Sequence, residues 1–456
     1  MTLKNGDGAQ WKAVQTLTAQ GNTFITGKYK TSATFTLATG QQTTLQSLDP
    51  VRYRSFVALQ DHRNGRFLWV REMPSGFNIR NAVVSKKENV LYISGDSRNS
   101  LTFTSTQGAF SLPNKGQEDM YLIQMDFKGN IQWGKTFGGN LRDYGGAVIA
   151  RPGGGCLVLS NPGSDKIELQ TKTSRVSVDT TNKPLFIALD SKGGIDWAKS
   201  YKSQRPSNVV KPVNNAAVTP QGDIVVAIKG LTLLLFKNDG TLKWTSEMQF
   251  LENNKPTTTY NLSATISKIQ INAKGEIFVF ATGDSFVPII LKQGTIHPAS
   301  GETNNLIFQY SPKGVLEWAM ALRSTRYIPS RHGYVDGARV LLSKDGSFYM
   351  AGSFGGKFTV QTPLGSQTYK ANRLSPFVTK LDSKGNIQWF HHLKTDSTTN
   401  ALISTFNLDE NGFLYLLGYL SFGSLYINNT ELKSSKTKPF IDTPFAFRMK
   451  TDGTLP

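Results

Sequence analysis

The sequence predicts an all-β protein, a seven-bladed β-propeller of four-stranded antiparallel blades. Three observations predict it: a hairpin pattern ending in tryptophan recurs, a strand flanked by turn residues recurs seven times, and no segment has helical periodicity. Four strands in about 65 residues are the content of one propeller blade. We therefore expect a single domain, residues 1–456, with the ring closed between the N- and C-termini.

The hairpin pattern joins an alternating apolar strand to a second strand that carries tryptophan. In six copies glycine stands four residues before the tryptophan, in the pairs Gly65 and Trp69, Gly129 and Trp133, Gly193 and Trp197, Gly240 and Trp244, Gly314 and Trp318, and Gly385 and Trp389. A seventh copy reaches Gly453 shortly before the chain ends. Alternation buries one face, glycine takes a positive-φ turn position, and the indole is expected to cover the sheet.

The second pattern is a strand between two turn residues, preceded by a shorter apolar strand. Its seven copies begin at Gly21, Glu88, Gly155, Gly222, Gly275, Gly346 and Gly412. Together the patterns give blades at roughly residues 10–75, 76–139, 140–202, 203–250, 251–324, 325–395 and 396–456, with residues 1–9 added to the last.

The seventh copy lacks a tryptophan strand. We expect residues near Thr2 to Gly8 or Gln10 to Gln15 to pair with the strand that holds Phe445 and Phe447, and so to close the ring. Trp11 lies only ten residues before Gly21, so it fits the inner strand of blade one better than a seventh motif position.

Most blades contain a further polar, alternating segment between the second strand and the hairpin. Such segments begin at Phe35, Phe358 and Ser424, and they predict small extra hairpins outside the core blade. Blade four omits the segment and passes from Gly230 almost directly to Leu233. Two interpretations stay open: the hairpins are loop decoration, or they form a rim around a binding face.

The chain is strongly basic, with 51 Lys and Arg against 32 Asp and Glu and a net charge of +19. This charge favours an anionic partner. The basic residues are scattered with no run of five or more, which is typical of a solvated surface, so nucleic acid is a less favoured partner than polysaccharide. No apolar stretch approaches the length of a transmembrane segment. The single cysteine, Cys156, is expected to be a buried, inert thiol.

With these residues in view, the chain resembles the bacterial seven-bladed beta-propeller repeat family, abbreviated SBBP. The matching features are the F-G-G after Trp133 and the D-x-x-G-x-x-x-W hairpins that begin at Asp126, Asp190 and Asp382. In other copies the aspartate is replaced by His62, Lys237 and Ser311. The resemblance implies an extracellular or cell-surface protein and assigns no activity. In the turns themselves, an aspartate is expected to bond turn amides rather than calcium.

Candidate binding residues follow the tryptophan strands, where arginines lie beside aromatic side chains. The arginine guanidinium forms paired hydrogen bonds with carboxylates, phosphates and sulfates, and the tyrosine ring stacks on the faces of sugar rings. The candidates are Arg142, Tyr144, Arg205, Arg323, Arg326, Tyr327, Arg331, His332, His391 and His392. The last two are consecutive on an expected strand, so they face opposite sides and do not ligate one metal together.

The sequence contains no G-x-S-x-G elbow, no phosphate loop and no zinc-enzyme spacing. We therefore predict a non-enzymatic binding or adhesion protein, monomeric, without cofactor or metal. Its expected partner is an anionic polysaccharide or glycan, or a protein on the cell surface. Two alternatives stay open: a scaffold domain of a larger surface or secretion assembly, and a polysaccharide-active enzyme with carboxylates around the axis.

Overall fold

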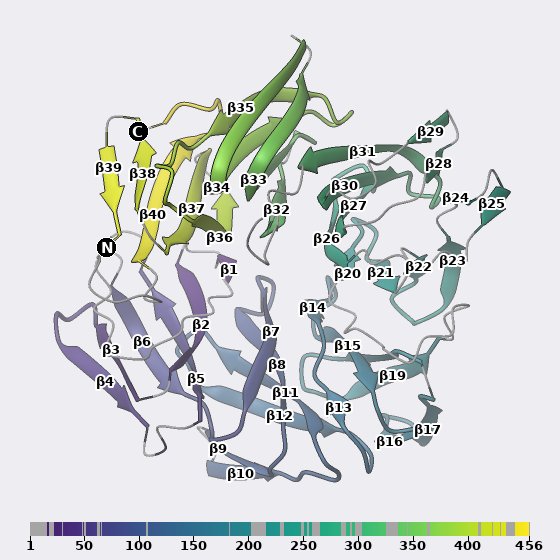
Figure 1. Ribbon diagram of the computed structural model, residues 1–456. Helices are drawn as coiled ribbons and strands as arrows, with labels where there is room; N and C mark the ends of the chain where they lie inside the picture. The colour runs from purple at the N-terminus through teal and green to yellow at the C-terminus, as the bar shows by residue number, and fades with distance from the viewer. Residues whose placement is uncertain are drawn as a thin grey trace. The chain divides into compact units, whose positions relative to one another are not determined.

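The structure is a computed structural model that describes most of the chain. The described residues are 16–17, 22–29, 31–47, 49, 52–61, 64, 66–105, 108–181, 183–201, 216–228, 232–247, 250–252, 255–257, 265–283, 289–291, 294–296, 303–324, 336–343, 345–362, 365–408, 412–421, 423–428, 430–434 and 443–455. These residues form strands and turns and no helix, hence no helix able to span a membrane (Figure 1).

The predicted all-β, seven-bladed β-propeller is confirmed. By its internal contacts the chain divides into two compact units. One unit comprises residues 1–218 with 236–242, and the other comprises residues 219–235 with 243–456. Blades one to three belong to the first unit, blades five to seven belong to the second, and the residues of blade four are divided between the two.

Blades one to three are antiparallel sheets. Blade one contains β1 (Thr16–Leu17), β2 (Thr23–Tyr29), β5 (Arg54–Gln60) and β6 (Phe67–Glu72). Blade two contains β7 (Asn78–Ser85), β8 (Val90–Ser97), β11 (Asp119–Asp126) and β12 (Ile131–Phe137). In blade three β13 (Asp143–Tyr144) and β14 (Val148–Ala150) both pair with β15 (Cys156–Pro162), followed by β18 (Leu185–Leu189) and β19 (Ile195–Ser200).

The later blades repeat this order. Blade four contains β20 (Ala216–Val218), β21 (Ile224–Ile228), β22 (Thr232–Phe236) and β23 (Leu242–Ser246). Blade five contains β26 (Thr265–Ile271), β27 (Ile277–Gly283), β30 (Thr303–Tyr310) and β31 (Leu316–Ser324). Blade six contains β32 (Asp336–Leu342), β33 (Phe348–Thr362), β34 (Gly365–Leu381) and β35 (Ile387–His392), and blade seven contains β36 (Ala401–Leu408), β37 (Phe413–Leu420) and β40 (Thr443–Lys450).

The expected extra hairpins are present. They are β3 (Ser32–Thr36) with β4 (Gln42–Gln46), β9 (Leu101–Ser105) with β10 (Gly108–Leu112), β16 (Lys166–Gln170) with β17 (Arg175–Asp179), β28 (Ile289–Leu291) with β29 (Gly294–Ile296), and β38 (Ser424–Ile427) with β39 (Thr430–Lys433). In blade six the hairpin is a continuation of β33 and β34, with a register shift between Phe354 and Gly356. A further hairpin, β24 (Phe250–Glu252) with β25 (Lys255–Thr257), precedes blade five.

The turn chemistry follows the sequence pattern. Every described motif glycine has a positive φ, for example 86° at Gly129 and 81° at Gly193. Asp126 Oδ1 accepts hydrogen bonds from the amides of Lys128 (2.9 Å) and Asn130 (2.8 Å), and Asp190 and Asp382 do the same in their turns. The predicted turn-bonding role of these aspartates is therefore confirmed.

The motif tryptophan does more than cover its own sheet. A Cβ added to Gly129 would lie 3.1 Å from the ring of Trp69, and the same relation joins Gly193 to Trp133 at 3.0 Å. Each indole therefore lies on the turn glycine of the following blade. Four of the indoles also donate Nε1–H to a carbonyl in that turn: Trp69 to Phe127, Trp133 to Ser191, Trp197 to Asn238 and Trp244 to Pro312.

Hydrophobic cores lie between neighbouring sheets. Leu59 of blade one and Ile93 of blade two belong to one buried cluster, and Phe280 of blade five and Phe377 of blade six belong to another. Cys156 is buried in the core between blades two and three, and burial raises the pKa of its thiol. The prediction of a buried thiol is confirmed.

The described part of blade seven has three strands, β36, β37 and β40. The short β1 pairs with β2, which makes it the first strand of blade one. Residues 1–15, expected to complete blade seven, lie outside the described residues, so closure of the ring by the N-terminus stays a prediction.

Candidate functional site

Half of the predicted binding residues lie outside the described residues: Arg205, Arg326, Tyr327, Arg331 and His332. Arg323 lies in β31, where its backbone pairs with Asn304 and Thr359, and nothing is described of its side chain. The other four, Arg142, Tyr144, His391 and His392, have described side chains.

His391 and His392 lie in strand β35, with their side chains in different surroundings. The ring of His391 packs 5.2 Å from that of Trp389, whereas His392 lies 4.9 Å from Phe354. Burial lowers the pKa of both imidazoles, and the charge of Lys394 lowers that of His392 further. The two side chains thus occupy different contacts, and both are half-buried.

His392 lies 2.8 Å from the hydroxyl of Ser375, a pair that merits a test as a nucleophile and base. Ser375 is fully buried, and its Oγ–H donates to the carbonyl of Leu393 at 2.9 Å. Since a hydroxyl has one proton to donate, Nε2–H of His392 must donate to Ser375. In this arrangement the imidazole donates to the serine hydroxyl rather than accepting its proton.

Arg142 and Tyr144 lie in a segment clamped between blades two and three. The amide of Asp143 donates to the carbonyl of Glu118 at 2.6 Å, and the carbonyl of Arg142 accepts from Gly163 at 2.8 Å. Tyr144 pairs with Asn161 of β15. These backbone bonds on both sides fix the direction in which the two candidate side chains leave the chain.

Asp143, between them, supports this loop. Its carboxylate accepts hydrogen bonds from the amide of Gly139 (2.7 Å), the amide of Ser164 (3.0 Å) and the hydroxyl of Ser164 (2.8 Å). Gly139 belongs to the F-G-G motif, and a Cβ there would lie 2.7 Å from the Ser164 hydroxyl. This close approach explains why the last position of the F-G-G motif is a glycine.

Blade seven repeats the clamp with Asp396, which accepts hydrogen bonds from the amides of Thr398 and Ser424, both at 2.8 Å. Burial raises the pKa of Asp396, but the hydrogen bonds from Thr398, Thr399 and Ser424 outweigh it and bring the pKa to about 2. An aspartate that holds a Gly-Ser turn is thus a structural element of more than one blade.

Next to Tyr144 lies an ion pair that sequence reasoning did not single out. Asp96, at the end of β8, is fully buried and accepts two hydrogen bonds from Arg80, Nε at 2.5 Å and Nη2 at 3.3 Å. Asn78 adds a third at 2.9 Å. The guanidinium carbon of Arg80 lies 6.0 Å from the centre of the Tyr144 ring, at the outer limit of a cation–π contact.

Glu118 brings a second carboxylate to Asp96. Burial raises the pKa of Glu118, and the charge of Asp96 and a hydrogen bond between the two carboxyl groups raise it further, while Arg98 opposes the shift. The Nε of Arg98 lies 3.5 Å from Glu118 Oε2, and its side chain is largely exposed. Glu118 is therefore protonated more readily than an isolated glutamate.

We call these residues the arginine–tyrosine site: Arg80, Asp96, Arg98, Glu118, Arg142 and Tyr144. Tyr144 is 38% exposed, and Arg142 is exposed. The Arg142 guanidinium makes no hydrogen bond or ion pair with any residue that the structure describes. The site thus combines a free guanidinium, an exposed aromatic ring and buried acceptors.

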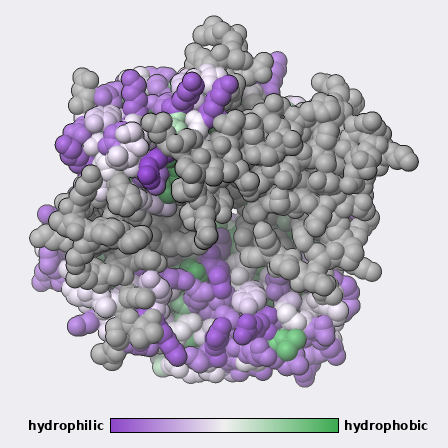
Figure 2. Space-filling view, in the orientation of Figure 1, coloured by the Kyte–Doolittle hydropathy of each residue, from purple (hydrophilic) through white to green (hydrophobic). Residues whose placement is uncertain are grey.

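Among the described residues on the face that Figure 2 shows, hydrophilic side chains predominate and few hydrophobic ones reach the surface. Among the described residues, no group of three or more His, Cys, Asp or Glu side chains has the geometry to hold a metal ion. Direct contact with arginine and tyrosine is therefore the chemistry that the arginine–tyrosine site offers.

No family model matches the chain, and no curated protein matches it. Several solved structures are similar in fold. The β-propeller domain of the Trilobed protease from Pyrococcus furiosus is 10% identical, with 95% of this chain and 100% of that chain covered and a TM-score of 0.40. BamB from Moraxella catarrhalis is 13% identical over 79% of this chain and 87% of that chain, with a TM-score of 0.36. At this level of similarity they carry no statement about function.

Proposed function

We propose that the protein is a non-enzymatic binding or adhesion propeller, secreted or on the cell surface, that recognises an acidic glycan at the arginine–tyrosine site. The observation that carries the proposal is the exposed Tyr144 side chain with the Arg80 guanidinium over its ring and the exposed Arg142 two residues before it. The resemblance to SBBP repeats, which suggests export, supports this location.

Each part of the site suits a sugar acid. A tyrosine face stacks on the apolar face of a sugar ring, and a guanidinium accommodates a carboxylate or sulfate with two parallel hydrogen bonds. Because Arg80 is already bonded to Asp96, it fixes the ring, while the exposed Arg142 reaches the ligand. The overall charge of +19 draws anionic chains toward the surface.

The test is retention on immobilised heparin, together with an array of acidic glycans, for the wild type and two variants. Arg142→Ala and Tyr144→Ala should each weaken binding about tenfold, because a charge-assisted hydrogen bond or a stacked ring contributes about 1.5 kcal/mol. Matched controls are Tyr426→Ala, a tyrosine equally exposed on β38, and Arg175→Ala on β17. Unchanged retention of the two site variants would overturn the proposal.

The arginines after Trp318 remain a separate prediction. The triple substitution of Arg323, Arg326 and Arg331 by alanine reports on that segment in the same assay. Loss of retention in this variant, with Arg142→Ala unaffected, would move the glycan site from the second and third blades to that segment.

A further inference from the structure

The outermost core strand of a blade has one hydrogen-bonding edge that no other core strand pairs with. In blades one to three the decorating hairpin meets this edge at the same position, two residues before the motif tryptophan. The parallel contacts are Leu37 with Phe67, Ser105 with Ile131, and Thr171 with Ile195. The carbonyl of Phe67 accepts from the amide of Ala38 at 2.8 Å, and that of Ile195 from Lys172 at 3.0 Å.

This contact buries the apolar side chain at that position. Phe67, Ile131 and Ile195 are 2%, 1% and 5% exposed. The hairpin thus covers both the backbone edge and the apolar residue of the outer strand, which are the two features that make an edge strand prone to pairing with another chain.

Blade four lacks the cover. Its strand β21 ends at Ile228 and β22 begins at Thr232, whereas residues 30–53 separate the corresponding strands of blade one. Among the described strands, β23 pairs with β22 alone. Leu242, two residues before Trp244, is 40% exposed. Among the described residues, nothing pairs with the edge of blade four that corresponds to the covered edge of the first three blades.

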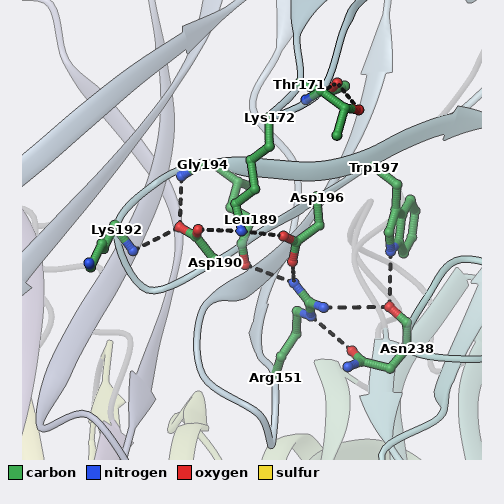
Figure 3. Close-up of polar contacts among 11 residues, drawn as sticks. Arg151, Thr171, Lys172, Leu189, Asp190, Lys192, Gly194, Asp196, Trp197 and Asn238 are labelled. Carbon is green, nitrogen blue, oxygen red and sulfur yellow. Dashed lines mark hydrogen bonds and ion pairs between the residues drawn. The ribbon is translucent and has the colours of Figure 1, made fainter.

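The charges beside this edge are reversed relative to blade three. In blade three Lys172 of the hairpin lies 2.5 Å from Asp190 and 2.7 Å from Asp196, as Figure 3 shows. Asp190 lies three residues before the turn glycine Gly193. Asp196 lies one residue before the tryptophan Trp197. Lys237 and Lys243 hold these two positions in blade four.

Both lysines reach solvent. Lys237 is exposed, and the side chain of Lys243 is 41% exposed beside Asp223, with 2.6 Å between Nζ and Oδ2. A covering strand with a lysine in the place of Lys172 would meet like charge in blade four. An acidic residue in that place would meet opposite charge.

We propose that the outer edge of blade four binds an extended, acidic segment of a partner protein, which runs parallel to β23. The partner's amide donates to the carbonyl of Leu242, an apolar or threonine side chain covers Leu242, and a carboxylate lies beside Lys237. This is β-strand addition, in which backbone bonds give affinity and side chains give selectivity. The proposal is independent of glycan binding.

A second copy of this chain is a poorer occupant. The covering hairpin of blade three carries Lys172 at the matching place, and Lys237 would repel this lysine in a second copy. The positive charge of Lys237 and Lys243 at this edge therefore favours a partner segment with negative charge.

The experiment uses a probe cut from the chain itself. A cyclised peptide of residues 163–181 with Lys172→Glu is compared with the same peptide carrying Lys172, by fluorescence anisotropy against the full-length protein. We expect the acidic peptide to bind at least about tenfold more tightly, and 1.4 kcal/mol corresponds to this ratio.

Three variants sharpen the test. Leu242→Asp should abolish binding of the acidic peptide, and Lys237→Glu should reverse the preference in favour of the Lys172 peptide. The matched control is Leu68→Asp on β6, since Leu68 is as exposed as Leu242 but does not occupy the covered position. Glycan retention should be unchanged in all three, so failure of the glycan proposal is scored separately.

The proposal is overturned if neither peptide binds, if Leu242→Asp binds as the wild type does, or if both peptides bind equally. It is also overturned if the wild type self-associates in sedimentation and Leu242→Asp removes the self-association, because a second copy would then be the occupant.

Discussion

Trp133 and Trp389 lie at equivalent places, each on the turn glycine of the following blade, and yet their polar contacts differ. Trp133 donates Nε1–H to the carbonyl of Ser191 at 3.1 Å. The Nε1 of Trp389 is buried and has no hydrogen-bond partner among the described residues. The apolar contact is thus repeated along the chain, while the hydrogen bond that accompanies it is not.

The residue two positions after the tryptophan also differs between junctions. Arg71 and Lys199 donate to the carbonyl of the next turn glycine, Gly129 and Gly240, both at 2.7 Å. At the last junction this position is His391, which has a hydrogen bond with the Gly453 backbone. The permanent cation of these two junctions, Arg71 or Lys199, is replaced at the last junction by a group that titrates near neutral pH.

The largest expected effect comes from removing an indole. Trp133→Ala should lower the free energy of unfolding by about 3–5 kcal/mol, because it leaves a cavity over Gly193 and a carbonyl without its donor. Trp389→Ala loses the apolar contact alone and should cost less. Urea denaturation of both variants measures the difference, and equal losses would mean that the indole hydrogen bond contributes nothing.

The glycine under the indole is the next test. Gly193 has φ of 81°, and a Cβ would lie 3.0 Å from the Trp133 ring. Gly193→Ala should therefore cost more than the about 1–2 kcal/mol expected for positive φ alone. Gly108→Ala is the control, since Gly108 has φ of 115° and no atom within 4 Å of its Cβ position. If both variants unfold at the same urea concentration, the indole contact does not constrain this turn.

A phenylalanine in place of the indole separates the hydrogen bond from the ring. Trp133→Phe should cost about 1 kcal/mol beyond the smaller ring, because Ser191 loses its donor. Trp389→Phe removes a buried, unpaired donor and should be close to neutral. The difference between the two urea midpoints measures the bond, and a larger loss at Trp389 would contradict the comparison.

The sequence predicts the repeating part of this fold well, because the signals are local. Glycine four residues before tryptophan identifies the hairpin, and the positive φ at Gly129 confirms its turn. The partner of the indole is not local, since Trp69 contacts Gly129 rather than Gly65, and a one-blade pattern carries no information about the next blade's turn.

Only part of the candidate site can be predicted from the sequence, again because contacts between blades are not local. Arg142 and Tyr144 are predicted from their place after a tryptophan strand, but Arg80, 64 residues before Tyr144 in the sequence, reaches it only through the stacking of blades. Asp96 lies in the segment SGDS at the end of a strand, which has no signal of its own. The missing hairpin of blade four was visible in the sequence, whereas the exposure of Leu242 was not.

The smallest expected effect concerns pH at the last junction. Burial lowers the pKa of His391, and the hydrogen bond with Gly453 opposes but does not cancel this shift. The folded pKa thus lies below the unfolded value of about 6.5, so the unfolded chain binds more protons between the two values. Stability should be full above about pH 7 and should fall as the pH drops below the unfolded value.

His391→Gln removes this titration while keeping a hydrogen-bonding side chain. The urea midpoint of the variant should fall less than that of the wild type between about pH 7 and pH 5, whereas Lys199→Gln, at the equivalent position of blade three, should leave the slope unchanged. The carboxylates contribute equally to all three proteins, so the difference between their slopes belongs to His391. Parallel slopes would show that its proton equilibrium is the same in the folded and unfolded chains, and the two junctions would then differ only in the indole hydrogen bond.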